Sequence, residues 1–323
     1  TGAEKVTTSF HTPLDLNNIE KAHKNILLDN LLFKAQLAEA LYTKTKDSTY
    51  LKTKRKSYET AHELIKLMGG ISDEDAFLDE AQFKNVYGNL MQIYQEEWKT
   101  TETKETFEKA LQLRLESQYV TILNELKSAQ KRKEITSIPF IKNLRATYQG
   151  YNTVFYFWGQ DAIYVLNENE TTQYFDKIPL TTVLEDAINE VSSGVRKIET
   201  PINKKAHQLI YKTLFEKYIQ PDAKTAILLD DKLHLIPVAS LWMEDEGTYL
   251  LQKTPVVHIT TTIRQKETTT SHQALLMAPF ATQQGIFNSR LTKSADEIKA
   301  IGQYFNHDAY IDQYASKTAF LDK

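Results

Sequence analysis

The sequence predicts a protein of class α + α/β, in which a helical array precedes an α/β region. No proline occurs between Pro13 and Pro139, and apolar residues recur there at helical spacing. Because proline costs about 3 kcal/mol inside a helix, a long stretch without it suits a series of helices. After residue 133, short runs of β-branched and aromatic residues alternate with helical patterns, which is typical of a sheet covered by helices.

The composition excludes several classes of protein. The 323 residues include 39 basic and 42 acidic side chains, so the net charge of −3 argues against a nucleic-acid binder. No stretch is apolar enough to span a membrane and no signal peptide is visible, so we expect a cytoplasmic protein. The absence of cysteine excludes a cysteine nucleophile and thiolate zinc sites within these residues. Neither common glycine-rich phosphate loop is present, and we expect no cofactor and no metal.

Breaks at residues 46–48, 69–73 and 99–101 divide the N-terminal region into at least four helices. Gly69 suits a left-handed C-cap, and Ser72 or Asp73 suits an N-cap. The apolar residues at helical spacing are Ile26, Leu27, Leu31, Leu37, Leu41, Tyr58, Ala61, Leu64, Ile65, Met68, Val86, Leu90, Ile93, Tyr94, Phe107, Ala110, Leu111, Leu115, Val120, Leu123 and Leu126.

A weak internal repeat indicates that the helices form pairs. Residues 58–64 and 107–113 share the pattern aromatic-Glu-x-Ala-x-x-Leu, and a Leu-Tyr or Ile-Tyr dipeptide precedes each. The small alanine lets two helices approach closely, as in tetratricopeptide-type (TPR) pairs. We therefore predict a TPR-like helical array over residues 1–132, with an irregular helical bundle as the alternative.

The remaining chain is predicted as a β-hairpin connector over residues 133–200 and an α/β domain over residues 201–323. The hairpin pairs strands 154–158 and 162–166 around a turn at 159–161, followed by a third strand at 173–178. Alternating strands and helices beyond it predict parallel strands. Helices are expected at 182–192, 203–219, 293–305 and from 317, and strands at 225–229, 233–236, 254–259, 274–277 and 309–311.

The run Leu229–Leu241, LDDKLHLIPVASL, resembles the segment PDG-x-L-h-x-[IL]-P-F-x-x-L of the CHAT-domain family. Domains of this family are caspase-like and usually follow tetratricopeptide repeats. Asp231 and Val238 replace the usual glycine and phenylalanine, and Gln118 stands where lysine is common. Other segments resemble family motifs in the same order, over about residues 30–323, namely 116–126, 154–166, 249–259, 291–298 and 315–320. The resemblance implies that an incomplete caspase-like α/β domain follows the array.

The CHAT family is similar to caspases and separases, which are cysteine peptidases with a His/Cys dyad in which the histidine generally precedes glycine. No histidine in this chain precedes glycine, and there is no cysteine. The resemblance therefore implies that both dyad positions lie beyond Lys323, that the chain is a fragment, and that it has no catalytic residues and no peptidase activity. A complete but degenerate protein is the alternative. A truncated sheet would also leave an unpaired strand edge, which predicts poor behaviour or dimerisation of the isolated fragment.

Two residues of the signature run could carry other chemistry. His234 lies beside Asp230 and Asp231, so acid–base or zinc chemistry is conceivable, although three ligands at suitable spacing are missing. Ser240 could pair with His234 as nucleophile and base, but no nucleophile-elbow motif surrounds it. We favour structural roles for both residues.

Three further clusters also have simpler explanations. The basic runs Lys52–Lys56 and Lys131–Lys133 favour a solvated helix face over RNA binding. Glu168–Glu170 favours a hairpin loop over a calcium site.

Tyr94, Trp98 and Phe107 could line a peptide groove on the array, although core packing is favoured. The sequence thus predicts the regulatory repeat portion of a CHAT-like cysteine endopeptidase, inactive as this chain. The alternative is a non-enzymatic TPR-type scaffold. In either case we expect a protein or peptide partner on the helical region, and neither nucleic acid nor membrane.

Overall fold

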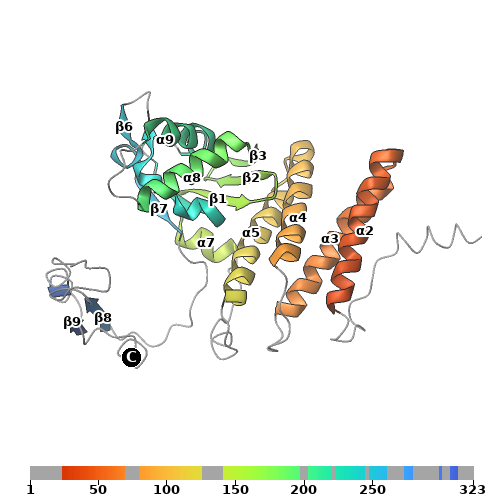
Figure 1. Cartoon of the computed structure of the whole chain (residues 1–323), viewed down its shortest axis with the longest axis horizontal. Coiled ribbons are helices and arrows are strands. Elements are labelled where there is room, and N and C mark those ends of the chain that lie inside the picture. The colour runs from red at the N-terminus through yellow and green to blue at the C-terminus, as the bar shows by residue number, and fades with distance from the viewer. Residues whose placement is uncertain are drawn as a thin grey trace, which may run out of the picture. The chain divides into compact units, whose positions relative to one another are not determined.

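The computed structural model describes residues 24–69, 80–125, 141–196, 203–219, 223–243, 247–259, 273–278, 298–299 and 306–311. The chain divides into two compact units, residues 1–265 and 266–323. The first unit combines helices with a sheet and contains every element discussed below except β8 and β9 (Figure 1). None of the helices in the described part of the chain has the length and apolar character that a bilayer span requires.

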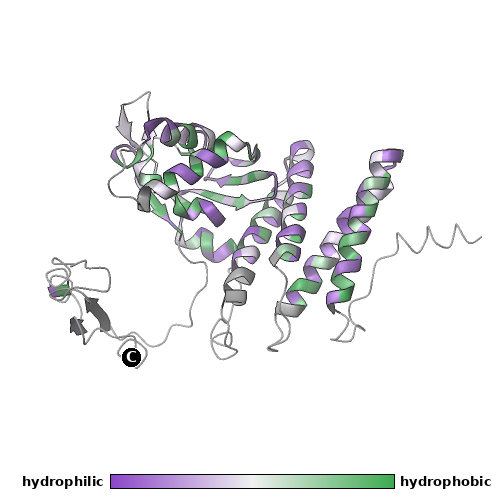
Figure 2. Cartoon of the chain, in the orientation of Figure 1, coloured by the Kyte–Doolittle hydropathy of each residue, from purple (hydrophilic) through white to green (hydrophobic). Residues whose placement is uncertain are grey.

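Four helices of 22 residues each form two hairpins, which confirms the predicted helical pairs. They are α2 (Lys24–Thr45), α3 (Ser48–Gly69), α4 (Glu80–Thr101) and α5 (Lys104–Glu125). Each packs against the next along the chain. Figure 2 shows that these helices mix hydrophobic and hydrophilic residues, as expected of helices with one packed side.

Both hairpins turn within two residues, by the same physical means. Lys46 and Glu102 have φ angles of 60° and 45°, the left-handed conformation that ends many helices. The following residues cap the next helix, because Asp47 Oδ1 accepts the N–H of Thr49 at 2.9 Å and Thr103 Oγ1 accepts that of Thr106 at 3.4 Å. The sequence repeat does not share this register, because it begins in the middle of α3, at Tyr58, and near the start of α5, at Phe107.

A five-stranded mixed sheet follows, in the order β3-β2-β1-β4-β7. The pairs β1–β2 and β2–β3 are antiparallel, whereas β4 is parallel to both β1 and β7. The predicted hairpin therefore belongs to the same sheet as the predicted parallel strands. The strands are β1 (Asn152–Trp158), β2 (Ala162–Glu168), β3 (Gln173–Pro179), β4 (Thr225–Leu228) and β7 (Val256–His258).

Alternating side chains place the two faces of the sheet in two different cores. Phe155 and Phe157 of β1 join the core that includes the helical array, whereas Val154 and Tyr156 join the other core. Helices α8 (Thr182–Arg196) and α9 (Lys204–Ile210) cover the second face (Figure 1). Short α7 (Ile141–Thr147) packs against α5. The sheet is therefore covered on both faces, which explains why β1 and β2 are apolar along most of their length.

One predicted strand is wrong. Residues 233–235 belong to a 3-10 turn over Asp231–Leu235, and Ile236 is its C-cap; Asp231 takes a left-handed φ of 44°, and the N–H of Leu233 bonds to the carbonyl of Asp230 at 2.9 Å. The predicted helix 203–219 begins as α9 and continues through a wider π-turn at Tyr211–Phe215. A second 3-10 turn spans Val238–Ser240, and β5 (Trp242–Met243) pairs with β6 (Thr248–Tyr249).

The second unit contains the parallel strands β8 (Gln273–Ala278) and β9 (Asn306–Ile311), which confirms two predicted strands and their direction. The predicted helix 293–305 lies mostly outside the described residues, and the one from 317 lies entirely outside them. The proposed domain boundaries at 132 and 200 remain predictions.

Candidate functional site

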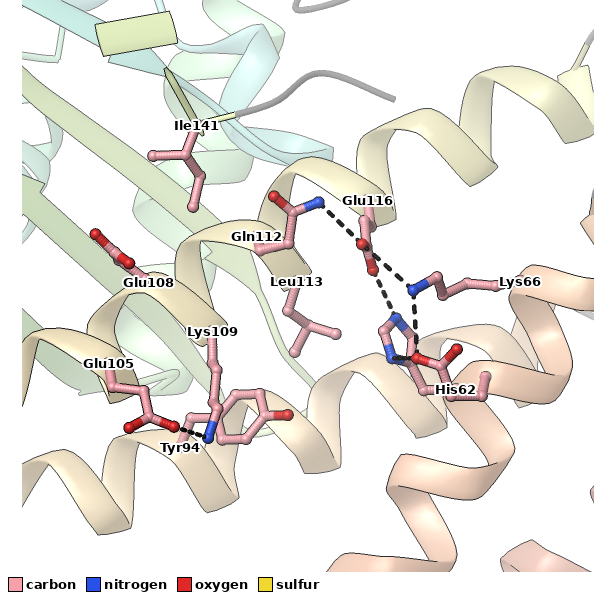
Figure 3. A pocket seen from close by; sticks show the side chains of 11 residues that line it. His62, Lys66, Tyr94, Glu105, Glu108, Lys109, Gln112, Leu113, Glu116 and Ile141 are labelled. Atoms are coloured by element: carbon pink, nitrogen blue, oxygen red, sulfur yellow. Dashed lines mark hydrogen bonds and ion pairs between the residues drawn. The ribbon is translucent and has the colours of Figure 1, made fainter. Parts of the chain in front are cut away.

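A pocket of about 420 Å³, which we call the groove, lies on the helical array beside α5. One face of α5 supplies six of its lining residues at positions i, i+3, i+4, i+7, i+8 and i+11, which is the spacing of a single helical stripe. Helices α3, α4 and α7 supply the rest (Figure 3). The lining residues are Glu105, Glu108, Lys109, Gln112, Leu113 and Glu116 from α5, with His62, Glu63, Lys66, Tyr94 and Ile141.

The buried carboxylate of Glu116 organises one end of the groove. His62 Nε2 lies 2.8 Å from it, Gln112 donates a hydrogen bond of 2.9 Å, and Lys66 lies at 3.8 Å (Figure 3). Burial raises the pKa of Glu116, but the hydrogen bonds from His62 and Gln112, together with the charges of His62 and Lys66, outweigh it, so the net pKa lies below its usual value. Glu116 is therefore ionised at neutral pH.

Behind His62 lies a second buried polar group. The ring of Tyr87 meets the His62 ring edge-on, with centroids 5.0 Å apart, and the Tyr87 hydroxyl has no hydrogen-bond partner. Burial is the main cause that raises the pKa of Tyr87 well above its usual value, and the negative charge of Glu116 raises it further. Tyr87 therefore stays neutral and supports the imidazole through ring contact.

The rest of the groove combines paired charges with an apolar floor. Lys109 pairs with Glu105 at 2.7 Å, and Arg145 of α7 pairs with Glu108 at 3.1 Å. Leu113 and Tyr94 add apolar surface. Among the residues that the structure describes, those lining the groove include no serine, threonine or cysteine. Four glutamates against two lysines also make it a poor site for a polyanion.

The opposite face of α5 carries Arg114, which is fully buried against the sheet. Its Nε donates to the carbonyl of Tyr156 in β1, and its Nη2 donates to the carbonyl of Leu229, just after β4, at 2.6 Å. The same nitrogen lies 3.4 Å from Asp230 Oδ1. Burial lowers the pKa of Arg114 and Asp230 raises it, yet a guanidinium stays charged. One helical side chain thus joins two neighbouring parallel strands.

We call residues 229–236 the signature turn, because they begin the run singled out in the sequence. Asp230 Oδ2 accepts the N–H of Trp158, at the end of β1, at 2.8 Å. Asp231 Oδ2 forms an ion pair with Lys84 Nζ of α4 at 3.1 Å. Its φ of 44° explains why a glycine suits this position, and aspartate is one of the few residues that tolerate it. Two helices of the array therefore hold two consecutive aspartates of the turn.

The other residues named from the sequence have structural surroundings. His234 is exposed, and its pKa is lowered by desolvation and partly restored by Asp230. Ser240 donates to the carbonyl of Pro237 at 2.9 Å, and its own carbonyl accepts from His207 rather than from His234. Among the described residues, no three histidines or carboxylates are grouped closely enough to hold a metal ion.

The structure describes most of the charged and aromatic clusters named from the sequence. In the run Lys52–Lys56, Lys54 pairs with Glu39 at 2.7 Å and Arg55 with Glu97 at 2.9 Å, whereas Lys131–Lys133 lies outside the described residues. Asn169 Oδ1 accepts bonds within the loop after β2, consistent with a hairpin loop at 168–170. Of the three aromatics, Tyr94 lines the groove, while Trp98 packs on the buried Phe107 with ring centroids 5.7 Å apart.

Sequence reasoning missed Arg114, Lys84 and the pair of His62 and Glu116. The one signal for Arg114 was a charged residue between Leu113 and Leu115, in a run of apolar positions. A charge at that place indicates a buried partner, since unpaired charges are rarely buried.

A comparison with known families matches residues 203–323 to the CHAT domain. The matched segment begins at Asn203, the residue that caps α9, and includes β4, the signature turn, β7, β8 and β9. No curated protein matches the chain. The chain has no cysteine, so the matched segment lacks the thiol that the resemblance associates with catalysis. The match confirms the resemblance drawn from the signature run, because residues 203–323 of this chain match the CHAT domain.

Proposed function

We propose that this chain is the regulatory helical portion of a CHAT-type cysteine endopeptidase, and that it has no peptidase activity by itself. The observation that carries this proposal is the double use of α5. One face of the helix lines the groove, and the other holds the signature turn through Arg114. A helix placed in this way suits a module that binds a protein or peptide and sits directly on the CHAT segment.

The chemistry of the groove favours a peptide as the partner. Its floor is apolar, its rim carries charges of both signs, and the buried Glu116 offers a fixed acceptor. A peptide can satisfy all three features, because it combines apolar side chains with backbone N–H donors.

The test is a selection of binding peptides from a displayed random library on the whole chain. Selected peptides are then measured against Gln112→Trp, which fills the groove, and against Gln36→Trp, the same change on an exposed position of α2. We expect at least a tenfold loss of affinity, about 1.4 kcal/mol, only for the first variant. Peptides that bind both variants equally, or a selection without binders, would contradict the proposal.

The absence of cysteine favours a second candidate, a non-enzymatic TPR-type scaffold that binds a protein partner. The reading frame downstream of Lys323 separates the two candidates. A His-Gly strand followed by a cysteine within about one further domain, roughly 100 residues, supports the peptidase. A reading frame without them supports the scaffold.

A further inference from the structure

We propose that α5 links the groove to the signature turn, so that a change in one alters the geometry of the other, with Arg114 as the positioning residue. The proposal rests on the proposed function only in treating the groove as the partner site. Leu113 and Arg114 are adjacent on α5, yet one side chain lines the groove and the other lies against the sheet. Successive residues of a helix point about 100° apart, so a rotation of α5 moves both sides together.

Arg114 cannot move independently of the sheet. Its guanidinium is buried and bonded to the carbonyls of Tyr156 and Leu229, and it lies 3.4 Å from Asp230. Removing these partners would leave a buried charge without compensation, which is strongly unfavourable. A displacement of α5 therefore either carries the ends of β1 and β4 with it or breaks these bonds.

The signature turn depends on the array for its ionic contacts. Asp230 is held between Arg114 and the N–H of Trp158, and Asp231 is held by Lys84 of α4. In a parallel sheet, the loops after the carboxyl ends of the strands are where functional groups are usually placed. The turn after β4 is such a loop. Its position relative to β1 is therefore controlled by the helices of the array that hold it.

The groove side of α5 is also tied to a neighbouring helix. Glu116 meets His62 of α3, and Gln112 supports that carboxylate. A group beside Gln112 that is too large for the open volume of the groove therefore shifts α5 relative to α3 or displaces these contacts. Because Gln112 lies two residues before Arg114, such a shift occurs within the same turn of helix as the sheet contacts.

The experiment measures hydrogen exchange of single backbone amides by NMR in the whole chain. The reporter is the amide of Trp158, which is bonded to Asp230, and the reference is the amide of Val165 in β2, which pairs with a strand on each side. The groove is perturbed by Gln112→Trp, with Gln36→Trp as the matched control. We expect exchange at Trp158 to rise at least about tenfold relative to Val165 in the first variant and to stay unchanged in the second.

Two further variants show whether Arg114 carries the effect. Arg114→Lys keeps the charge but lacks the planar fork that reaches two carbonyls and a carboxylate, so this single substitution should raise exchange at Trp158 even with the groove unchanged. Adding Gln112→Trp to Arg114→Lys should then have little further effect. If the arginine variant does not fold, Lys84→Met replaces it and tests the contact to Asp231.

An equal rise at Trp158 and Val165 means global destabilisation and overturns the proposal, as does an unchanged Trp158 amide in Gln112→Trp. No partner is needed for these measurements. If the groove binds no peptide but the exchange is linked, the proposed function falls and the linkage stands. If peptides bind but the groove substitution does not change exchange at Trp158, the proposed function stands and the linkage falls.

Discussion

The two helical hairpins are built alike but placed differently. All four helices have 22 residues, and both turns use a left-handed first residue followed by a capping residue. In the first hairpin, however, α2 exposes the large apolar residues Ile26, Phe33 and Leu37. In the second, α5 is covered by the sheet and by α7. Local sequence therefore determines the hairpin, whereas the neighbours determine which of its faces are buried.

Both hairpins bury polar groups, but their partners differ; in the first, the buried Lys54 of α3 pairs with Glu39 of α2, inside the same hairpin. The second hairpin buries Arg114, Glu116 and Ser117 on α5, all within one turn. Burying such groups is costly unless each has a partner, and the two charged groups find partners on other elements: Arg114 bonds to the carbonyl of Leu229, and Glu116 contacts His62 of α3. The second hairpin is therefore specified by its contacts with the rest of the protein, and the first mainly by its own packing.

The largest expected effect compares the same truncation in the two hairpins. Leu111 of α5 is fully buried, so Leu111→Ala should lower the free energy of unfolding by about 3 kcal/mol, since it removes apolar contacts and leaves a cavity. Leu37 of α2 is 39% exposed, so Leu37→Ala should cost less than about 1 kcal/mol. Urea unfolding of both variants measures the difference. Equal losses would mean that the exposed apolar residues of α2, Ile26, Phe33 and Leu37, are covered in solution.

Features set by local sequence were predictable. The helix break at 46–48 and the β-hairpin around 159–161 agree with the structure, whereas the break predicted at 99–101 lies at 102–103, just after the end of α4. Gly159 fits there because a Cβ would lie 2.8 Å from the ring of Tyr164. The wrong strand at 233–236 followed from alternating apolar residues, but Leu235 is 45% exposed and points away from the core that the pattern implied.

The candidate site was less predictable, because it depends on contacts between distant residues. Arg114 meets Leu229 across 115 positions, and Lys84 meets Asp231 across 147. No spacing rule in a single sequence relates such pairs. The signature run could be recognised from its residues, but its anchoring to the array could not.

A smaller effect distinguishes two arginines of similar exposure. Arg145 is 33% exposed and makes a two-pronged contact with Glu168 of β2, at 2.7 and 2.6 Å. Its hydrogen bonds to Glu168 raise its pKa. Arg145→Met should cost about 1.5 kcal/mol, because paired bonds to a largely buried carboxylate are strong. Arg55→Met, between α3 and α4, should cost about 0.5 kcal/mol, because Glu59 and Glu97 are more exposed.

Urea unfolding again provides the measurement, with Arg145→Lys as the control that keeps the charge and loses the fork. An intermediate loss for the lysine variant is expected. If Arg55→Met lowers the free energy of unfolding as much as Arg145→Met does, the ion pair between α3 and α4 stabilises the fold as much as the ion pair between α7 and the sheet.

A weak pH dependence should affect the side of the sheet away from the array. Burial lowers the pKa of His207 below its usual value of 6.5, although its bond to the Ser240 carbonyl and the charge of Glu190 raise it. The unfolded chain therefore binds a proton more readily, so stability is full above pH 6.5 and falls as the pH drops below it. The melting temperature of the wild type between pH 5 and 7.5 should fall more steeply than that of His207→Gln. Parallel curves would exclude His207 as the cause.

The smallest expected effect concerns Asp231, where the array and the signature turn meet. A left-handed residue other than glycine costs about 1 kcal/mol, so Asp231→Gly gains by relieving strain. It also loses the contact with Lys84, which is worth about 0–1 kcal/mol because Lys84 is 56% exposed. These terms nearly cancel, and the change in the free energy of unfolding should stay within about 0.5 kcal/mol. Asp231→Ala neither relieves the backbone strain nor keeps the ion pair with Lys84, so it should lower the free energy of unfolding by about 1 kcal/mol.

Lys84→Met separates the two terms, because it removes the ion pair and leaves the backbone of Asp231 unchanged. A loss for Asp231→Gly that matches the loss for Lys84→Met would mean that strain is negligible and that the ion pair alone matters. A gain for Asp231→Gly together with a small loss for Lys84→Met would mean that aspartate is kept at a strained position at a net cost to stability. In that case its contact with α4 would serve to place the signature turn against the array rather than to stabilise the fold.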